Sequence, residues 1–568
     1  MIYTACRYAP VELFAGFRTQ VARLDPVVKD YACAEACTHP NLCGYAKALY
    51  EEIQAKHVDE LVLTDCCDAT RRLYDVLASE GRMKFLWLLP LPHKNGEAEI
   101  RLFAGALEDL ERAYSSYRWK TFDVDLAIQA YERQRTSEEE KMKKTGTCIR
   151  IAGAHASGDL VETVEKIFPG VDVENATCTG NRAMLKPAGD RDSFFLWYAD
   201  YLLNQPAPCM RMQHNGIAGE TENMADNKSM KVLGTIFHTI KFCDFYSFAY
   251  LKEKTSETPL LKIETDATQQ SEGQLRTRLE AFREELGLDD LEEKMTETNQ
   301  NVNGPVYTAG IDSGSASTDA VILDAQCSIL GRAIVPTGSG AVDGAKKALA
   351  IALEQAGLRQ EDLTRIVTTG YGRSSIEIEG RAVTEITCHA RGAHFLDPQV
   401  RTVIDIGGQD SKVICIDEDG RVKNFVMNDK CAAGTGRFLE MQAQAMGLTM
   451  PQMSEKGLQW KKDVTISSMC TVFAESEVVS LVAENVAVED IIHGLNKAIA
   501  EKTAGLVSRS NGGPVFMMTG GVAQNQGVVE CLSKKLNAEV RVSPDAQVCG
   551  SLGAALIALE SLGIKQAE

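Results

Sequence analysis

The feature that most constrains this chain is an internal repeat in its C-terminal half. Residues 310–324, GIDSGSASTDAVILD, align without gaps with residues 403–417, VIDIGGQDSKVICID. Each copy reads as an apolar strand ending in an aspartate, a glycine turn and a second apolar strand. Glycine lets backbone amides close around phosphate oxygens, and an aspartate at a strand end can hold Mg²⁺ through water. One such hairpin is common, but a gapless duplicate 93 residues away indicates two related phosphate-binding lobes.

Two cysteines in the same half stand just before predicted helices. Cys431 precedes AAGTGRFLEMQAQAM, which has helical spacing and stops at Gly447. Cys470 precedes a second helical run with one apolar stripe, formed by Phe473, Val478, Leu481 and Val482. The positive end of a helix favours the thiolate, which is the form that binds metal. A homodimer could therefore hold one four-iron cluster on its two-fold axis, although spacing alone fits two buried structural cysteines equally well.

Residues 306–568 resemble the ATP-dependent activators of 2-hydroxyacyl-CoA dehydratases and the related benzoyl-CoA reductase and double-cubane reductase ATPases. The motifs that carry the resemblance are VIDIGGQDSK, NDKCAAGTGRFLE, SMCTVFAESE and MMTGGVAQNQGV. The resemblance implies an α/β fold with two ribonuclease-H-like lobes of the actin and Hsc70 type, at about 306–400 and 401–568. It also implies a [4Fe-4S] cluster that bridges a homodimer through Cys431 and Cys470.

The same resemblance gives individual residues a role around ATP and Mg²⁺. Asp312, Asp405 and Gln409 are the expected catalytic residues. The expected nucleotide contacts are Gly314, Ser315, Thr318, Gly407, Gly408, Lys412, Gly434, Thr435, Gly436, Gly520, Gly521 and Gln547. Activators usually carry lysine at the position of Asp319, so nucleotide affinity or magnesium dependence is expected to differ here. His389 is interpreted as a helix-packing or capping residue rather than a base.

The first half reads as two α/β units. ELVLTD (60–65) and MKFLWLLPLP (83–92) are expected to be buried parallel strands, and CIRIAGAHA, from residue 148, to begin a second unit. Successive βα units predict two flavodoxin-like, parallel-sheet lobes at 1–145 and 146–288. A polar segment at 289–305 is expected to link them to the ATPase half.

Ten of the 17 cysteines precede residue 250, where metal or redox use is a better expectation than disulfides. Residues 1–286 resemble a shortened D-component subunit of 2-hydroxyacyl-CoA dehydratase, through APVELFAGF, HPNLCGYAKAL, TDCCDATRRLYDVL, GTIFHTIKFCDFYSF and TPLLKIETDATQQSEGQLRTRLEAF. That resemblance implies a cluster held by Cys43, Cys67 and Cys243, with Cys66 as a rival for the second position.

Further cysteines raise a second arrangement. Double-cubane proteins of the same superfamily use six cysteines, and the extra candidates here are Cys33, Cys37, Cys66 and Cys178. Each cysteine taken alone is more often buried than ligating. Glu12, in the Pro-x-Glu stretch, is a weak acid–base candidate, and a solvated glutamate on the first helix is the preferred interpretation.

Composition narrows the function classes. The formal net charge is −19 and no basic stripe is present, which argues against nucleic-acid binding. The absence of an 18-residue apolar run and of a signal-peptide pattern predicts a cytoplasmic protein without a membrane anchor. The expected function is an ATP-dependent, low-potential electron-transfer activator, with ferredoxin or flavodoxin as donor and a dehydratase D-component as partner. The alternatives are a self-contained ATP-dependent reductase with a double-cubane-type cluster and a small-molecule kinase with structural cysteines.

Overall fold

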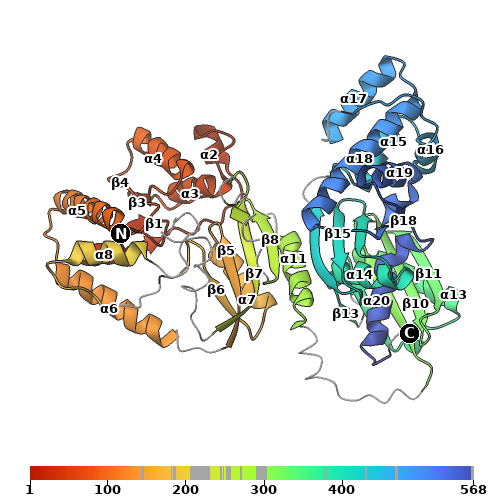
Figure 1. Cartoon of the computed structure of the whole chain (residues 1–568), viewed down its shortest axis with the longest axis horizontal. Coiled ribbons are helices and arrows are strands. Elements are labelled where there is room, and N and C mark those ends of the chain that lie inside the picture. The colour runs from red at the N-terminus through yellow and green to blue at the C-terminus, as the bar shows by residue number, and fades with distance from the viewer. Residues whose placement is uncertain are drawn as a thin grey trace. The chain divides into compact units, whose positions relative to one another are not determined.

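The computed structural model divides the chain into two compact units, Met1–Leu286 and Gly287–Glu568 (Figure 1). The structure describes residues 1–564 apart from 142–145, 181, 183–186, 205–229, 244–245, 247–248, 251–257, 269–271, 289–303, 339, 377, 379, 429–431 and 467–470. Most of the linker expected at 289–305 therefore lies outside the described residues. The finer domain boundaries stay predictions.

The N-terminal unit begins with a parallel sheet of order β2-β1-β3-β4. Its strands are β1 (Ile2–Thr4), β2 (Val21–Arg23), β3 (Glu60–Thr64) and β4 (Phe85–Leu89). The accompanying helices are α1 (Val11–Ala15), α2 (Ala32–Cys37), α3 (Gly44–Ala55), α4 (Asp68–Glu80), α5 (Glu97–Arg118) and α6 (Val124–Lys141). The two strands expected at 60–65 and 83–92 are confirmed as β3 and β4.

A second parallel sheet of order β6-β5-β7-β8 follows in the same unit. Its strands are β5 (Gly146–Gly153), β6 (Asp172–Asn175), β7 (Met230–Ile240) and β8 (Leu260–Thr265), and its helices are α7 (Gly158–Ile167), α8 (Phe194–Leu203) and α11 (Glu272–Glu285). Both sheets have the order 2-1-3-4, which flavodoxin-like folds share. The prediction of two parallel-sheet lobes is confirmed, and the carboxyl ends of their strands are where such folds bind ligands.

The interpretation of Glu12 as a solvated side chain is wrong. Glu12 is only 2% exposed, on the buried face of α1. Its carboxylate accepts hydrogen bonds from Arg182 Nη2 at 2.7 Å and from the hydroxyl of Tyr198. A buried carboxylate needs such partners, because an uncompensated charge in the interior is costly.

The C-terminal unit contains two five-stranded sheets with matching orders, β11-β10-β9-β12-β13 and β16-β15-β14-β17-β18. The first comprises β9 (Tyr307–Ser313), β10 (Ser317–Asp324), β11 (Ile329–Pro336), β12 (Arg365–Thr369) and β13 (Arg381–Ala382). The second comprises β14 (Thr402–Ile406), β15 (Ser411–Ile416), β16 (Val422–Asn428), β17 (Phe516–Thr519) and β18 (Val540–Arg541). In each sheet the first three strands in sequence are antiparallel and the last two run parallel to the first. The duplicated-lobe prediction is confirmed.

Helices pack around these sheets. They are α13 (Ala341–Ala356), α14 (Glu385–Leu396), α15 (Gly436–Ala445), α16 (Met450–Lys456), α17 (Thr471–Ala483), α18 (Val488–Ser510), α19 (Gln526–Leu536) and α20 (Cys549–Glu560). Short 3₁₀ turns are η2 (Gln360–Asp362), η3 (Arg373–Ser375), η4 (Gly521–Gln524) and η5 (Ala546–Val548). No helix among the described residues is both long and apolar enough to cross a membrane.

Two details of the predicted cysteine helices need correction. Cys431 and Cys470 lie outside the described residues, but α17 begins directly after Cys470 whereas α15 begins only at Gly436. The turn at Gly434, with a φ of 82°, is incompatible with an earlier helix start. The predicted apolar stripe on α17 is also wrong, because Val478 is buried while Phe473 and Val482 are 67% and 46% exposed.

Candidate functional site

The aspartates of the two repeats, Asp312 and Asp405, stand near the carboxyl ends of the equivalent strands β9 and β14. After each strand a glycine amide closes the turn: Gly314 N donates to the Ser317 carbonyl at 2.9 Å, and Gly407 N to the Asp410 carbonyl at 3.1 Å. The two turns face each other, since a Cβ on Gly408 would lie 2.8 Å from the Cβ of Ala316. Two glycine turns from different lobes thus meet beside two carboxylates.

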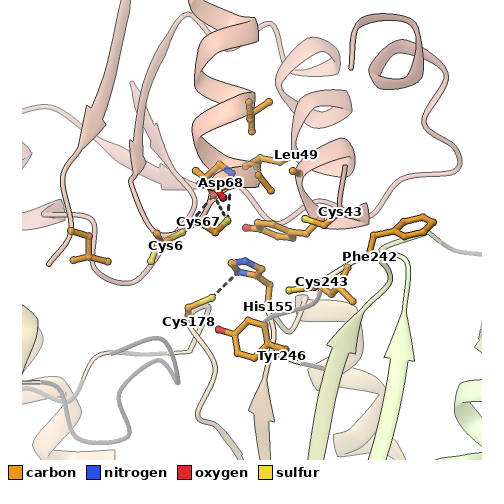
Figure 2. A pocket seen from close by; sticks show the side chains of 18 of the residues that line it. Cys6, Cys43, Leu49, Cys67, Asp68, His155, Cys178, Phe242, Cys243 and Tyr246 are labelled. Carbon is orange, nitrogen blue, oxygen red and sulfur yellow. Dashed lines mark hydrogen bonds between the residues drawn. The ribbon is translucent and has the colours of Figure 1, made fainter. Parts of the chain in front are cut away.

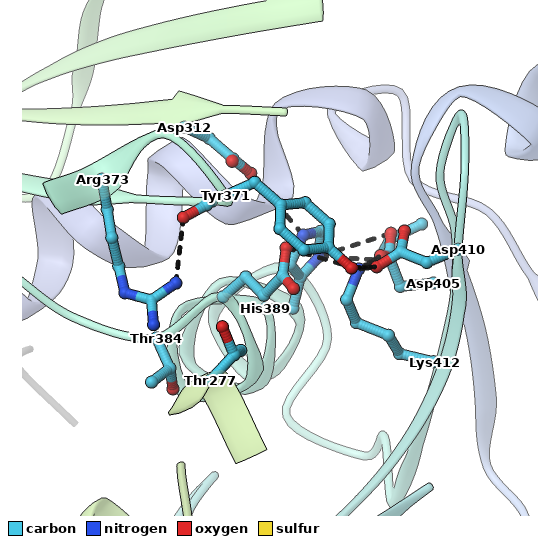
Figure 3. A network of polar contacts seen from close by, with 12 residues as sticks. Thr277, Asp312, Tyr371, Arg373, Thr384, His389, Asp405, Asp410 and Lys412 are labelled. Carbon is cyan, nitrogen blue, oxygen red and sulfur yellow. Dashed lines mark hydrogen bonds and ion pairs between the residues drawn. The ribbon is translucent and has the colours of Figure 1, made fainter. Parts of the chain in front are cut away.

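His389 of α14 lies between these carboxylates (Figure 3). Its Nε2 is 3.7 Å from an Asp312 oxygen and its Nδ1 is 3.7 Å from an Asp405 oxygen. Thr519 lies 3.3 Å from Nδ1 and donates to Asp405 at 3.1 Å. Burial opposes the charged imidazolium, but the neighbouring carboxylates outweigh it and raise the pKa of His389 well above its usual value. The residue expected only to pack or cap α14 therefore connects the two lobes electrostatically.

Lys412 balances the negative charge on the second hairpin. Its ammonium lies 2.7 Å from Asp410, 3.2 Å from Asp405 and 3.4 Å from Glu385. Burial works against the ammonium, yet the three carboxylates raise the pKa of Lys412 well above its usual value. Burial similarly acts against ionised Asp405, but His389 and Lys412 keep its pKa below the ordinary range.

Asp319 occupies the matching position on the first hairpin, opposite Asp312 in the strand register. Its side chain is buried, and Oδ1 has no hydrogen-bond partner within the described part of the chain. Burial and the neighbouring Asp312 raise the pKa of Asp319 to about 8. The carboxyl group is therefore mostly protonated at neutral pH, where lysine would carry a charge.

Two further glycines occupy equivalent positions in the two lobes, each beside one of the aspartates. Gly370 follows β12 and Gly520 follows β17, with φ values of 85° and 80°. A Cβ at Gly370 would lie 2.5 Å from Asp312 Oδ1, and one at Gly520 would lie 2.7 Å from Asp405 Oδ1. Each aspartate thus rests against a glycine that no larger residue could replace. Gly520 was among the expected nucleotide contacts and Gly370 was not, although both follow the fourth strand of a lobe.

The other expected nucleotide contacts remain predictions, and the structure places them as follows. Gly436 N donates to the Gly407 carbonyl at 2.8 Å, so the start of α15 rests on the second glycine turn. The loop before α15 contains Gly434 and Thr435, and the first glycine turn contains Ser315, with Thr318 following on β10. Gly520 lies directly before η4, Gly521 in η4 and Gln547 in η5. Gln409 is exposed in the second turn.

A cavity of about 320 Å³ in the N-terminal unit gathers six cysteines (Figure 2). They are Cys6, Cys43, Cys66, Cys67, Cys178 and Cys243. Cys6 follows β1, Cys66 and Cys67 follow β3, and Cys178 and Cys243 come shortly after β6 and β7. The strand ends of both sheets therefore converge on one space, with Tyr45 and His155 stacked at 3.7 Å in its wall.

The cavity thiols differ in their local contacts and in the pKa of the thiol group. Cys43 and Cys67 are the N-cap residues of α3 and α4, and Cys67 Sγ accepts a hydrogen bond from the amide of Thr70 at 3.4 Å. Cys178 Sγ lies 2.6 Å from His155 Nδ1. Burial raises the pKa of the Cys43 thiol to about 12, and a hydrogen bond with Cys67 together with burial raises that of Cys66. Without metal the thiols of Cys43 and Cys66 stay protonated, so binding of metal by these two residues would release protons.

The described residues contain no group of three or more histidine, cysteine, aspartate or glutamate side chains close enough to hold a single metal ion. A cubane is wider than one ion, because its four irons occupy separate corners and each thiolate binds a different iron. Six thiols around one cavity, two of them at helix N-termini, fit the donor set of an iron–sulfur cluster.

Most of the candidate ligands in the N-terminal unit line this cavity, but two do not. Cys43, Cys66, Cys67, Cys178 and Cys243 line it, whereas Cys33 and Cys37 are exposed on α2 and are not among its lining residues. Cys6 was missed, because the strand before it is only the three residues Ile2–Thr4 and gives no periodic signal. Its place directly after an apolar N-terminal run was the available clue.

Two family profiles match the two units separately. The profile of the BadF/BadG/BcrA/BcrD ATPase family matches residues 309–558, and that of the 2-hydroxyglutaryl-CoA dehydratase D-component matches residues 6–144 and 119–286. The activator of lactoyl-CoA dehydratase from Anaerotignum propionicum is 46% identical over 256 residues, which are 45% of this chain and 98% of that protein. The (R)-2-hydroxyglutaryl-CoA dehydratase activating ATPase of Acidaminococcus fermentans is 45% identical over 254 residues, 44% of this chain and 97% of that protein.

A solved structure of the 2-hydroxyisocaproyl-CoA dehydratase activator from Clostridium difficile with bound ADPNP is 40% identical, covers 46% of this chain and 100% of that one, and has a TM-score of 0.44. The duplicated sheets with facing glycine turns define the C-terminal unit as a two-lobed α/β fold of the actin and Hsc70 class. Within that class, the chain belongs to the BadF/BadG/BcrA/BcrD ATPase family, and the two named activators match this chain along nearly their whole length.

Proposed function

We propose that this protein is an ATP-driven electron-transfer activase for 2-hydroxyacyl-CoA dehydratase-type chemistry, with the activating ATPase and an iron–sulfur acceptor in one chain. The observation that carries the proposal is the convergence of six cysteines on one cavity, in a chain whose other half belongs to an ATPase family. Ferredoxin or flavodoxin is the proposed electron donor, and a dehydratase D-component is a proposed external partner.

In the ATPase unit, ATP with Mg²⁺ would bind between the facing glycine turns, near Asp312 and Asp405. The second turn supports the start of α15 through two hydrogen bonds, Gly436 N to Gly407 O and Arg437 N to Gly408 O, both at 2.8 Å. A movement of that turn on binding or losing the γ-phosphate would therefore move the segment that follows Cys431. Such mechanical coupling is how nucleotide switches usually reach distant groups.

Cys431 and Cys470 from two copies of the chain would hold a bridging [4Fe-4S] cluster, and a position directly before the first residue of α17 would favour the thiolate of Cys470. In the N-terminal unit, Cys43, Cys67 and Cys243 would hold an acceptor cluster. Such clusters supply low-potential one-electron transfer. The apolar walls provided by Leu49, Leu73 and Leu91 would keep water from the cavity.

A second candidate function is a self-contained ATP-dependent reductase with a double-cubane-type cluster. The specific observation in its favour is that Cys6, Cys66 and Cys178 line the same cavity as Cys43, Cys67 and Cys243. Two sets of three thiols are what two linked cubanes need. In this alternative the chain would reduce a small substrate itself instead of activating a separate dehydratase.

Iron per chain in anaerobically purified protein tests both proposals. A bridging cluster alone gives about 2 irons per chain, an added cubane about 6 and a double cubane about 10. Cys67→Ala should lower the count to about 2, whereas Cys148→Ala, a buried cysteine of β5 outside the cavity lining, should leave it unchanged. Protein that stays iron-free under anaerobic reconstitution would overturn the proposal and favour a small-molecule kinase.

A further inference from the structure

A second, larger cavity of about 580 Å³ in the N-terminal unit shares one wall residue, Cys6, with the cysteine cavity. It is bounded by the ends of β1 and β2, by α1 and α6, and by Gly180 and Arg182. Its lining contains three guanidinium groups and one carboxylate, namely Arg7, Arg23, Arg182 and Glu12. Neither ATP hydrolysis nor a cysteine-bound cluster accounts for this excess of positive charge.

Arg182 is the central group of this second cavity. Its side chain is only 9% exposed, and Nη2 donates to Glu12 at 2.7 Å. The other terminal nitrogen, Nη1, is buried and has no hydrogen-bond partner among the described residues. Because a buried donor left unpaired is destabilising, a guanidinium with a spare donor on a cavity wall points to an acceptor supplied by a ligand.

The rest of the lining indicates the chemistry of that ligand. Glu12 is already paired, with Arg182 and Tyr198, so it can accept little more from a bound molecule. Arg7 is buried beside the cavity and Arg23 is exposed at its edge. The remaining wall includes the apolar side chains of Val11, Ala15, Val21 and Ala130. A planar guanidinium binds a carboxylate through paired hydrogen bonds, while an apolar wall suits a short hydrocarbon chain.

We propose that this cavity binds the carboxylate of a small aliphatic acid, with Arg182 as the anchoring residue. The position next to Cys6 suggests that such an acid is part of the compound on which the N-terminal unit acts; this last step rests on the proposed function. Inorganic phosphate shares the negative charge but would leave the apolar wall without a partner. Short-chain carboxylates should therefore bind more tightly than phosphate.

Calorimetric titration of the iron-free, full-length protein with butyrate, succinate and phosphate tests the site. Wild-type protein should bind at least one of the two carboxylates, and phosphate at least 10-fold more weakly. Arg182→Gln should weaken carboxylate binding roughly 10- to 100-fold, the range expected for the loss of a charge-assisted hydrogen bond. Arg191→Gln removes an arginine of similar charge that pairs with Asp125 at the surface, and it should change nothing.

Arg182→Gln also leaves Glu12 buried without its cation, so that variant could fail to fold. Ala130→Glu provides an independent test, because it places a carboxylate on the cavity wall from a partly exposed position of α6. It should abolish binding in a folded protein. Glu12→Gln should tighten binding several-fold, since it removes the carboxylate charge that competes with the ligand for Arg182.

Wild-type protein that binds neither carboxylate, or that binds phosphate equally well, would overturn the carboxylate site. Unchanged affinity in folded Ala130→Glu protein would do the same. Because the titration uses iron-free protein, its failure would overturn only this site. An N-terminal unit that takes up no iron would instead overturn the proposed function.

Discussion

The two hairpins of the ATPase unit share one backbone design but carry opposite charges at a matched position. Asp319 faces Asp312 in the first hairpin, and Lys412 faces Asp405 in the second. Lys412 is surrounded by three carboxylates within 3.4 Å and remains charged. Asp319 has no such cation, and burial with Asp312 keeps it largely protonated. The glycine turn therefore does not depend on the side chain that follows it, and the charge there is set by its surroundings.

Asp312 and Asp405 have different neighbours although they occupy the same place in the fold. Asp405 is stabilised as a carboxylate by Lys412 and His389. Asp312 faces a protonated acid, Asp319, and shares His389 with Asp405. Mg²⁺ and nucleotide phosphates would thus meet an asymmetric site, in which the second hairpin carries the balanced charge.

Lys412→Met should produce the largest effect. The change leaves Glu385, Asp405 and Asp410 buried without their cation, which is expected to cost about 3–5 kcal/mol. Hydrogen exchange of peptides from β14 and β15 should accelerate accordingly. Asp319→Asn is the matched variant on the other hairpin, and at pH 7 it should leave its own strands at least as stable as in wild type, because the amide removes the cost of protonating Asp319 on folding. Equal effects of the two substitutions would contradict the asymmetry.

The raised pKa of Asp319 should make the stability of the first hairpin depend on pH. Its pKa is about 8 in the folded protein and about 3.9 in an unfolded chain. Between these values the folded state binds the extra proton, so stability relative to Asp319→Asn should fall as pH rises, by roughly 1 kcal/mol per pH unit. The contribution is complete below about pH 4 and lost above about pH 8.

Denaturant unfolding of wild-type protein and Asp319→Asn at intervals from pH 5 to pH 9 measures this difference. The asparagine variant serves as the non-titrating reference at the same position. Stability curves that stay parallel over this range would show that Asp319 ionises normally and that the two hairpins differ less than the structure indicates.

Asp319→Lys should make the two hairpins alike. A lysine opposite Asp312 would repeat the pair formed by Lys412 and Asp405, and would add positive charge beside the phosphate turn. We expect the affinity for a non-hydrolysable ATP analogue to rise about tenfold at low salt, and less at high salt. Glu361→Gln also adds one unit of positive charge, at an exposed position at the other end of β12, and should have little effect. Weaker nucleotide binding by Asp319→Lys would mean that this position does not face the phosphates.

Much of the C-terminal fold could be predicted because it is encoded locally. The gapless repeat predicted both hairpins. Asp319 was recognised from the sequence as a departure from the lysine that activators usually carry there. The role of His389 could not be read in the same way. Its position depends on how closely α14 approaches α20, where a Cβ on Gly550 would lie only 2.9 Å from the imidazole. That approach is a tertiary contact between segments about 160 residues apart in sequence.

In the N-terminal unit, too, local sequence predicted some residues of the site and could not reveal contacts between distant segments. The strand-end cysteines Cys66, Cys67 and Cys243 were recognised from local sequence, because open α/β sheets bind ligands there. Cys6 was missed after a strand too short to identify, and Glu12 was wrongly interpreted as solvated. The partner of Glu12, Arg182, is 170 residues away, so no local pattern could reveal the buried pair.

Tyr371→Phe should give the smallest effect and sharpens the comparison between the lobes. The Tyr371 hydroxyl donates to Asp410 at 3.3 Å, and so joins the end of β12 to the turn of the second hairpin. Asp410 keeps its closer contact with Lys412 at 2.7 Å, and Tyr371 is 40% exposed. Removing the hydroxyl should therefore cost no more than about 1 kcal/mol, seen as a shift of a few degrees in the melting temperature.

Nucleotide affinity should stay within about twofold of wild type in this variant, because His389 still lies between the carboxylates of the two lobes. A tenfold loss of nucleotide affinity would contradict this expectation. It would mean that the lobes are held in register by the Tyr371 hydroxyl at the edge of the site, and that the imidazole between Asp312 and Asp405 contributes little to their alignment.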